Sequence, residues 1–466
     1  MTEKRKLAMP DTLIIVASVV LLVAILSWII PSGTYDYQEM NINGRIRNVA
    51  IDGTYHTIDK SEVTTTGFLG FFSVLYWGCV KAADVIFMIL CCCGTFGVVV
   101  KTGAFHAGIG TILKKLKGKE ILLVPIIMLI FGLGGSVFGM ASEFYGFYPL
   151  IVGLGVALGY DAMFGFAIIA VGEFVGFMGA TLNPYSVGIA QTISGVELYS
   201  GTGYRTICFV IFMVISIIYV MMYGRKIKKN PGASVVFGEK NIHAFDRDEL
   251  NEYSFTLKDG LVLLDVLVVL VVLMFGLIKW GWDFPQLCGL FLLMSMIAAA
   301  ICKWSPNKWC SEFIDSAKTA MWGCILTGIA KAITVVMQDA QIMDTVIYGL
   351  SNVLKNAPHA VSAQVMLVVQ TLINFFIPSA TGQASATMPI MAQLADIIGV
   401  SRQTAVLAFQ FGDGLSNIFW PTADIVIICG LGGISLQKWY KWFTPLFLIL
   451  FATQAILLGI ATGIGF

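Results

Sequence analysis

Two long apolar stretches of the sequence, 240 residues apart, are each interrupted by glycines and polar residues. The first covers residues 121–158 and is broken at 139–143, and the second covers residues 361–398 and is broken at 379–385. Unpaired backbone amides and carbonyls are too costly to expose to lipid, so non-helical backbone persists at membrane depth only inside protein or beside a watery cavity. The chain must therefore fold so that both interruptions are enclosed.

The two regions also share helix-breaking and acidic residues when they are superposed without a gap. Interrupted apolar segments at corresponding positions of two halves are the strongest sequence indication of a transporter's binding site. The alternative is that these residues only kink tightly packed helices. The coinciding pairs are Pro149 with Pro389, Gly159 with Gly399, Gly172 with Gly412, and Glu173 with Asp413.

Composition places the chain in a membrane and excludes several classes of function. Hydrophobic residues make up 57% of the sequence and charged residues 12%, and the mean hydropathy is +0.83, values that a soluble domain of this length does not reach. A net charge of +1 gives no indication of a nucleic-acid partner. The ten cysteines and four histidines show neither disulfide nor metal-ligand spacing, so we expect no bound cofactor.

Apolar runs and lysine-rich loops together predict an all-α polytopic fold with nine spans and two re-entrant hairpins. Basic flanks place the N-terminus and a linker at 224–258 in the cytoplasm, and the polar segment 31–66 outside. The linker separates a first transmembrane half, 1–223, from a second, 259–466, which enters the membrane with inverted orientation. Expected within the halves are a cytoplasm-facing hairpin at about 121–158, a broken helix at about 162–193, an outside-facing hairpin at about 361–398 and a broken helix at about 403–430.

Polar and ionisable side chains gather at the two hairpin tips and the two helix breaks. Ionisable groups at membrane depth are costly and are functional by default. Broken helices offer N-termini to anions and C-termini to cations, so a substrate and a coupling Na⁺ or H⁺ can both be held there. For substrate binding we expect Ser142, Glu143, Asn183, Thr381, Gly382, Gln383, Asp413 and Asn417. For ion coupling we expect Glu173, Ser186, Ser385, Ser416, Thr422 and Asp424.

Five tracts of the sequence resemble the YfcC family of C4-dicarboxylate anaerobic carriers, within the ion transporter superfamily. The most specific tract is SRQTAVLAFQFGDG at 401–414. The resemblance covers nearly the whole chain, except the external loop from residue 36 onward and the central linker. The other four tracts are WIIPSGTY at 28–35, GMASEFYGFYP at 139–149, TLNPYSVGIAQ at 181–191 and GQASATMP at 382–389.

This resemblance implies inverted repeats, a scaffold that forms a homodimer, and a transport domain that moves as an elevator in the bacterial inner membrane. The tips depart from the serine-asparagine-threonine pattern of better-known dicarboxylate carriers, because one holds Ser142 and Glu143 and the other holds Thr381, Gly382 and Gln383. Relatives named as arginine/ornithine exchangers share the architecture. The resemblance therefore leaves the charge of the substrate open.

Acidic residues outnumber basic ones at the predicted breaks. Glu143, Glu173, Asp413 and Asp424 lie there, whereas Lys331 is the one basic residue placed at mid-membrane. An acid-rich site favours a cationic ligand or a coupling cation, which predicts a secondary transporter or exchanger of a basic amino acid such as arginine or ornithine. The alternative is a Na⁺- or H⁺-coupled carrier of C4-dicarboxylates, because helix N-termini bind carboxylates without basic side chains.

Three other interpretations compete with a carrier of this kind. Glu173 or Asp413 could pair with Lys331 or Arg402 and serve only to lock helices together. Opposed hairpins also occur in channels, although an acid at each break fits an occluding carrier better. An intramembrane protease would use Asp161 with Asp413, but residue 410 is glutamine where such enzymes have glycine, and no other catalytic motif is present.

Overall fold

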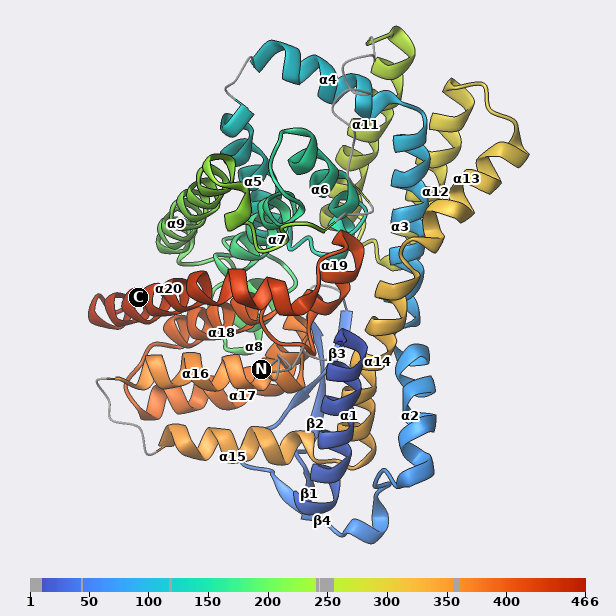
Figure 1. The fold of residues 1–466 in the computed structure, drawn as a ribbon. Coiled ribbons are helices and arrows are strands. Elements are labelled where there is room, and N and C mark those ends of the chain that lie inside the picture. Colours follow the sequence, from blue (N-terminus) through green and yellow to red (C-terminus); the bar gives the residue numbers. More distant parts are fainter. Residues whose placement is uncertain (1–10, 43–44, 117–119, 240–242, 244–254, 356–360) are drawn as a thin grey trace, which may run out of the picture.

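The computed structural model describes residues 11–42, 45–116, 120–239, 243, 255–355 and 361–466. Within these residues the fold is helical apart from four short strands near the N-terminus (Figure 1). The prediction of an all-helical membrane protein is therefore confirmed, although the external segment was expected to form only a loop.

Seven helices in the described part of the chain are long and apolar enough to cross a membrane. Many of their large apolar side chains, such as Leu21, Ile218 and Leu267, are exposed on the monomer, as lipid-facing side chains are. The seven helices are α1 (Thr12–Ile29), α3 (Ala83–Lys101), α9 (Thr202–Lys229), α11 (Leu257–Lys279), α12 (Phe284–Ile301), α14 (Met321–Asp339) and α20 (Leu436–Gly463).

The other two of the nine expected spans are each divided into two helices. The first division contains Pro184 and the second contains Pro421, and proline cannot donate the amide hydrogen that a continuing helix requires. In the middle of each span, some backbone amides and carbonyls therefore have no helical hydrogen-bond partner. The two pairs are α7 (Ala162–Met178) with α8 (Val187–Ile193), and α18 (Arg402–Ser416) with α19 (Asp424–Gly432).

The first interrupted stretch forms two helical arms around an irregular tip. α5 (Leu123–Leu133) continues as a π-helix over Gly134–Phe138 and stops at Gly139, whose φ of +69° is left-handed. A 3-10 turn at Ser142–Phe144 then leads into α6 (Phe147–Ala157). Glycine is required at the stop because a left-handed backbone is unfavourable for other residues.

The second interrupted stretch has a shorter tip than the sequence indicates. α16 (Ser362–Phe376) and α17 (Ala380–Ile397) lie on either side of it. Ser379 caps α17 by accepting a hydrogen bond from the Gly382 amide at 3.4 Å. The helix therefore begins inside the predicted interruption at 379–385, and the polar residues there occupy its first turns.

Helix lengths recur in the same order in the two halves of the chain. α1 and α12 have 18 residues each, α3 and α14 have 19, and α9 and α20 have 28. α4 (Ala104–Leu116) and α15 (Met343–Lys355) have 13 each. α2 (Phe68–Lys81) packs against α14, and α13 (Pro306–Lys318) packs against α3 (Figure 1). Each half thus supplies a helix that covers a long helix of the other.

The segment 31–66 is anchored to the start of α15 by one buried carboxylate. Asp344 accepts hydrogen bonds from the Tyr37 hydroxyl at 2.8 Å, the Tyr35 amide at 3.1 Å and the Thr34 hydroxyl at 3.1 Å. Burial and the nearby Asp344 raise the pKa of the Tyr37 hydroxyl, which therefore stays protonated as a donor. The strands pair antiparallel, β1 (Ser32–Thr34) with β4 (His56–Ile58) and β2 (Tyr37–Ile42) with β3 (Arg45–Ala50).

Glycines let α5 and α7 approach closely. A Cβ added at Gly176 would lie 2.1 Å from the carbonyl oxygen of Gly132, and one at Gly135 would lie 2.5 Å from the carbonyl oxygen of Glu173. Small residues drive this kind of contact in membranes, where close packing replaces the hydrophobic effect. The contact fixes the first hairpin against α7 and holds Glu173 beside the hairpin tip.

Candidate functional site

The two broken spans cross each other near their breaks. The Gln410 side chain of α18 donates a hydrogen bond of 2.7 Å to the carbonyl oxygen of Phe177 at the end of α7. A Cβ added at Gly414 would lie 2.4 Å from the Cα of Met178, so the helices touch through their backbones. The irregular segments of both halves are thereby brought to one place.

The tip of the first hairpin packs directly on the α7–α8 break. The Asn183 side-chain oxygen accepts hydrogen bonds from the amides of Tyr185 at 2.9 Å and Ser186 at 3.2 Å. A Cβ at Gly139 would lie 2.3 Å from that oxygen, so only glycine fits at the tip. Asn183 is fully buried and replaces helical hydrogen bonds that the break removes.

The second hairpin reaches the same break from the other side. The Thr381 hydroxyl donates a hydrogen bond of 3.0 Å to the carbonyl oxygen of Tyr185. Gln383, predicted as a substrate ligand, instead donates to the Gln370 side chain within its own hairpin at 2.6 Å. Ser385 donates to the carbonyl oxygen of Thr381, one turn earlier in α17, at 2.9 Å. Of these residues, Thr381 connects the two halves of the chain.

Glu173 is a fully buried carboxylate in the middle of α7, one turn before the break. The Tyr148 hydroxyl of α6 donates a hydrogen bond of 2.9 Å to its Oε2 atom. Its Oε1 atom is buried and has no hydrogen-bond partner among the described residues. Buried polar atoms without partners are rare in proteins and require an explanation such as a missing ligand.

Asp413 occupies the corresponding position in α18 and is also fully buried. The Asn374 side chain donates hydrogen bonds to its Oδ1 atom at 3.1 Å and to its carbonyl oxygen at 2.8 Å. The same amide donates to the Asn417 side chain at 3.0 Å, which ties α16 to the break. The Oδ2 atom of Asp413 has no partner within the described part of the chain.

Asp424 begins α19 and accepts a hydrogen bond of 2.7 Å from the Tyr145 hydroxyl. It lies close enough to Glu173 and Asp413 for electrostatic interaction with both, and Lys331 faces it in the same way. Three acids from the two broken spans therefore form one cluster, which we call the acidic cluster: Glu173, Asp413 and Asp424.

The remaining predicted site residues lie around the acidic cluster with different bonding. Glu143 accepts a hydrogen bond from the Ala141 amide at 3.0 Å and interacts electrostatically with Glu173. The hydroxyls of Ser186 and Thr422 are buried without a partner among the described residues. Ser142 belongs to the 3-10 turn of the first tip, Gly382 donates its amide to Ser379, and Ser416 donates to the Gly412 carbonyl at 2.5 Å.

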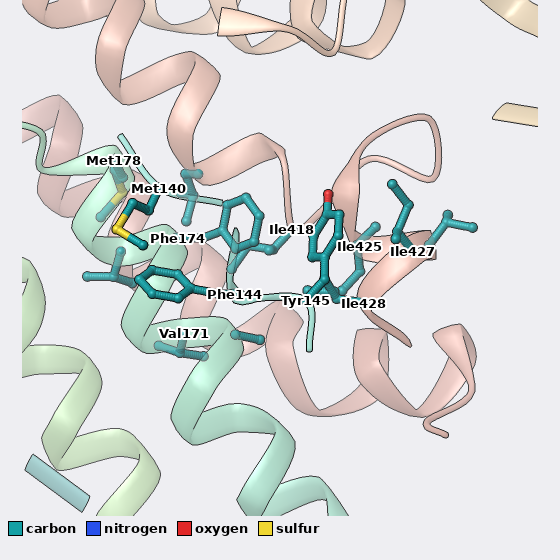
Figure 2. Packing of buried hydrophobic residues seen from close by; sticks show 14 of the residues in the cluster. Met140, Phe144, Tyr145, Val171, Phe174, Met178, Ile418, Ile425, Ile427 and Ile428 are labelled. Atoms are coloured by element: carbon teal, nitrogen blue, oxygen red, sulfur yellow. The ribbon is translucent and has the colours of Figure 1, made fainter. Parts of the chain in front are cut away.

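A hydrophobic cluster surrounds these polar groups. Figure 2 shows the side chains of Met140, Phe174 and Met178 packed beside the first tip, with Tyr145 directed towards the isoleucines of α19. Apolar walls exclude water and strengthen electrostatic interactions inside a site. The acidic cluster is therefore enclosed by apolar side chains.

The sequence did not single out the three donors that hold the acidic cluster. Tyr145 and Tyr148 are three residues apart, so a helix start there places both hydroxyls on one face. Each donates to an acid of a different half of the chain. Asn374 lies in an apolar helix, and apart from its polarity nothing in the sequence indicated that it contacts an acid.

Glu173 and Asp413 do not form the structural ion pairs with Lys331 or Arg402 that were considered as an alternative. Glu173 is bonded by Tyr148, and Asp413 is bonded by Asn374. Arg402 instead pairs with Asp396 at 2.7 Å. Asp161, the second aspartate of a protease reading, caps the far end of α7 by accepting from the Phe164 amide at 2.7 Å. The length of α7, about 25 Å at 1.5 Å per residue, separates it from the break.

Comparison with known proteins identifies the family. A family model described as a C4-dicarboxylate anaerobic carrier, DcuC, matches residues 9–463. The chain belongs to the DcuC family. Among DcuC-like relatives, the Escherichia coli (strain K12) protein named "Putative basic amino acid antiporter YfcC" is 32% identical over 490 residues, which cover 97% of this chain and 96% of that protein. The predicted resemblance to the YfcC family is confirmed.

A further relative and two solved structures are also similar. An uncharacterized protein of Haemophilus influenzae is 27% identical over 98% of this chain and 97% of its own length. The YdaH transporter of Alcanivorax borkumensis covers 98% of this chain and 99% of its own, with 14% identity and a TM-score of 0.44. MtrF of Neisseria gonorrhoeae covers 98% and 96%, with 16% identity and a TM-score of 0.44. As a DcuC family member, the chain is a multi-pass membrane transporter.

Proposed function

We propose that this transporter exchanges a basic amino acid, such as arginine or ornithine, for a related one. The observation that carries the proposal is the bonding of the acidic cluster. Tyr148, Asn374 and Tyr145 are neutral donors, so none of these hydrogen bonds neutralises a carboxylate. Among the described residues, Lys331 is a cation that acts electrostatically on Asp424. Buried carboxylates of this kind are stabilised by a cationic ligand.

In this proposal the two ends of the amino acid bind different elements. The carboxylates of Glu143 and Asp413 hold the cationic group. The α-carboxylate lies at the first turn of α17, at the positive end of the helix dipole, where the Thr381 hydroxyl and the Gly382 amide would exchange their bonds to Tyr185 and Ser379 for bonds to the substrate. Asn183, Ser142, Gln383 and Asn417 shape the pocket around these two contacts.

We also propose that ion coupling uses Na⁺ or H⁺ at the breaks. Glu173 and Asp424 are carboxylates, and the hydroxyls of Ser186 and Thr422 are buried without partners in the described chain. Oxygen ligands of this kind suit a hard cation. Ser385 and Ser416 donate to helix carbonyls and would act by positioning the backbone.

The proposed architecture is a pair of inverted repeats that move as an elevator against a dimeric scaffold. The equal lengths and common order of the helices in both halves support two repeats. Domains 1–223 and 259–466, with the linker 224–258, would carry one repeat each. Lysines in the last turn of α9 and in α13 support a cytoplasmic N-terminus in the bacterial inner membrane.

An alternative function is coupled transport of C4-dicarboxylates. The description of the family model favours it, and so does Lys331, which faces Asp424 beside the breaks. In that case the acidic cluster would hold coupling cations, and the N-terminus of α17 would bind a substrate carboxylate.

Counterflow in proteoliposomes separates the two functions. Vesicles are loaded with unlabelled arginine, ornithine or succinate, and the entry of labelled arginine or succinate is followed. Accumulation of arginine against internal arginine or ornithine is expected. Accumulation of succinate alone would overturn the basic amino acid assignment, and flux without counterflow would indicate a channel.

A further inference from the structure

A cavity of about 500 Å³ lies at the beginning of α7, away from the acidic cluster. Its walls are the end of α6, the start of α7, the end of α9 and the turn after α19, and residues 231–239 cover it. Asp161 at this end of α7 lies 12 residues before Glu173, which is roughly 18 Å along a helix. The cavity has the size of an ordinary small-molecule site.

Both carboxylates that line the cavity are already used by the protein. Asp161 accepts hydrogen bonds from the Phe164 amide at 2.7 Å, the Tyr223 hydroxyl at 2.5 Å and the Ser234 hydroxyl at 2.6 Å. Glu239 forms an ion pair with Lys438. The three donors fix the position of the Asp161 carboxylate, and neither acid forms an ion pair with Lys228.

Lys228 is the one cation among the residues that line the cavity, and its side chain is exposed. Its Nζ atom lies 4.8 Å from the centre of the Tyr160 ring. It forms no ion pair with a carboxylate of the described residues. A lysine over an aromatic face with no counter-charge retains its attraction for an anion.

The remaining walls are apolar and open towards the surface. Val156, Ile227, Val236 and Ile434 line the interior, and Phe237 at the rim is 66% exposed. An occupant with a negative charge next to an apolar body can contact both Lys228 and these walls. Such a ligand is an amphiphile, not a simple inorganic ion.

A second cavity, built from matching elements of the other half, gives a contrast. It measures about 220 Å³, lies between α8, α17 and the start of α18, and is covered by the β2–β3 hairpin. Its basic residue, Arg402, is neutralised by Asp396 through three hydrogen bonds of 2.7–3.1 Å. Among the described residues, a basic side chain without an ion pair therefore distinguishes the cavity at Lys228 from this one.

We propose that the cavity at Lys228 binds a phosphate ester attached to an apolar body, with an anionic phospholipid as its source. The basic residues Arg225, Lys226 and Lys229 around Lys228 mark the face that the charge distribution places in the cytoplasm. Basic pockets between helices on that face bind the head groups of anionic lipids. The phosphate contacts Lys228, and the glycerol and acyl chains lie along Val236 and Ile434.

The test uses the purified full-length protein and lipid binding measured by native mass spectrometry. Phosphatidylglycerol is expected to bind about tenfold more tightly than phosphatidylcholine, a difference of about 1.4 kcal/mol. Lys228→Gln should lose this preference, and Lys228→Arg should retain it. Lys226→Gln is the matched control, because it removes the same charge from the same helix end outside the cavity.

Equal loss in Lys226→Gln and Lys228→Gln, or no preference in the wild type, would overturn the proposal. A cooperative melting transition measured in parallel for each variant shows that the variant is folded. Competition by water-soluble glycerol 3-phosphate distinguishes the sources. Displacement of the lipid at similar concentration would retain the phosphate-ester site and assign it to a soluble ligand, whereas failure to displace assigns it to the membrane.

Discussion

Single hydroxyls and amides determine how each buried acid is held. Tyr148 and Asn374 each satisfy one oxygen of a carboxylate whose other oxygen has no partner among the described residues, and Tyr145 donates to Asp424. A donor of this kind orients the acid without cancelling its charge. The proposed preference for a cationic substrate therefore depends on individual side chains.

Asp413→Asn is expected to abolish exchange without unfolding the protein. The amide keeps the shape and an oxygen that can accept from Asn374, but removes the charge proposed to hold the substrate cation. Hydrogen bonds to charged groups contribute about 1.5–3 kcal/mol, so counterflow should fall by about tenfold or more. Asp396→Asn, which breaks an exposed ion pair with Arg402, is the control and should retain activity. Normal uptake by Asp413→Asn would remove its assigned role.

Tyr148→Phe is expected to lower stability by about 1–3 kcal/mol, because it leaves the Glu173 carboxyl buried with no hydrogen bond. Thermal unfolding in detergent measures the loss. Tyr76→Phe changes an exposed tyrosine with no recorded hydrogen bond and should be neutral. If the donor acts through the acid, Glu173→Gln should show strong coupling with Tyr148→Phe in a double-mutant cycle, and additive effects would contradict this.

At the scale of elements, the positions of the breaks were predictable and their exact form was not. Glycine and proline disfavour helix, so their positions in the sequence indicate both interrupted stretches and both divided spans. The start of α17 was misplaced because Ser379 provides a cap that lets the helix begin at once. A cap depends on local geometry that residue type only partly indicates.

Gly139→Ala is expected to disrupt the first tip. The position has a left-handed φ, which costs roughly 1–2 kcal/mol for other residues, and the new methyl would meet the Asn183 side chain. Transport and melting temperature should both fall. Gly203→Ala in the first turn of α9 is the control, because nothing lies within 4 Å of its Cβ. Equal tolerance of both changes would show that the tip has room to relax.

At the scale of the whole molecule, the contacts that assemble the site join residues far apart in the chain. The Tyr145–Asp424 hydrogen bond spans 279 residues, and the Tyr37–Asp344 bond spans 307. No local pattern encodes such a pair, so the sequence identified the acids but not their donors. The segment 31–66 was expected to be a loop, whereas β2 and β3 form a local hairpin and Asp344 of the other half anchors the segment.

The topology predicts opposite sides for two exposed positions. A membrane-impermeant maleimide should label His56→Cys in β4 on intact cells, and should reach the native Cys310 of α13 only after permeabilisation. The other accessible cysteines are replaced first, and counterflow confirms that the protein remains functional. Labelling of both positions from outside would contradict the proposed orientation.

The exchange of helices between halves has a consequence during synthesis. α3 packs against α13, and α2 packs against α14, so neither half is complete by itself. About 200 residues separate the end of α3 from the start of α13. At a translation rate of roughly 5–20 residues per second, α3 waits about 10–40 s in the bilayer before its partner leaves the ribosome. Throughout that interval, lipids or the insertion machinery must cover the surface that α13 later occupies.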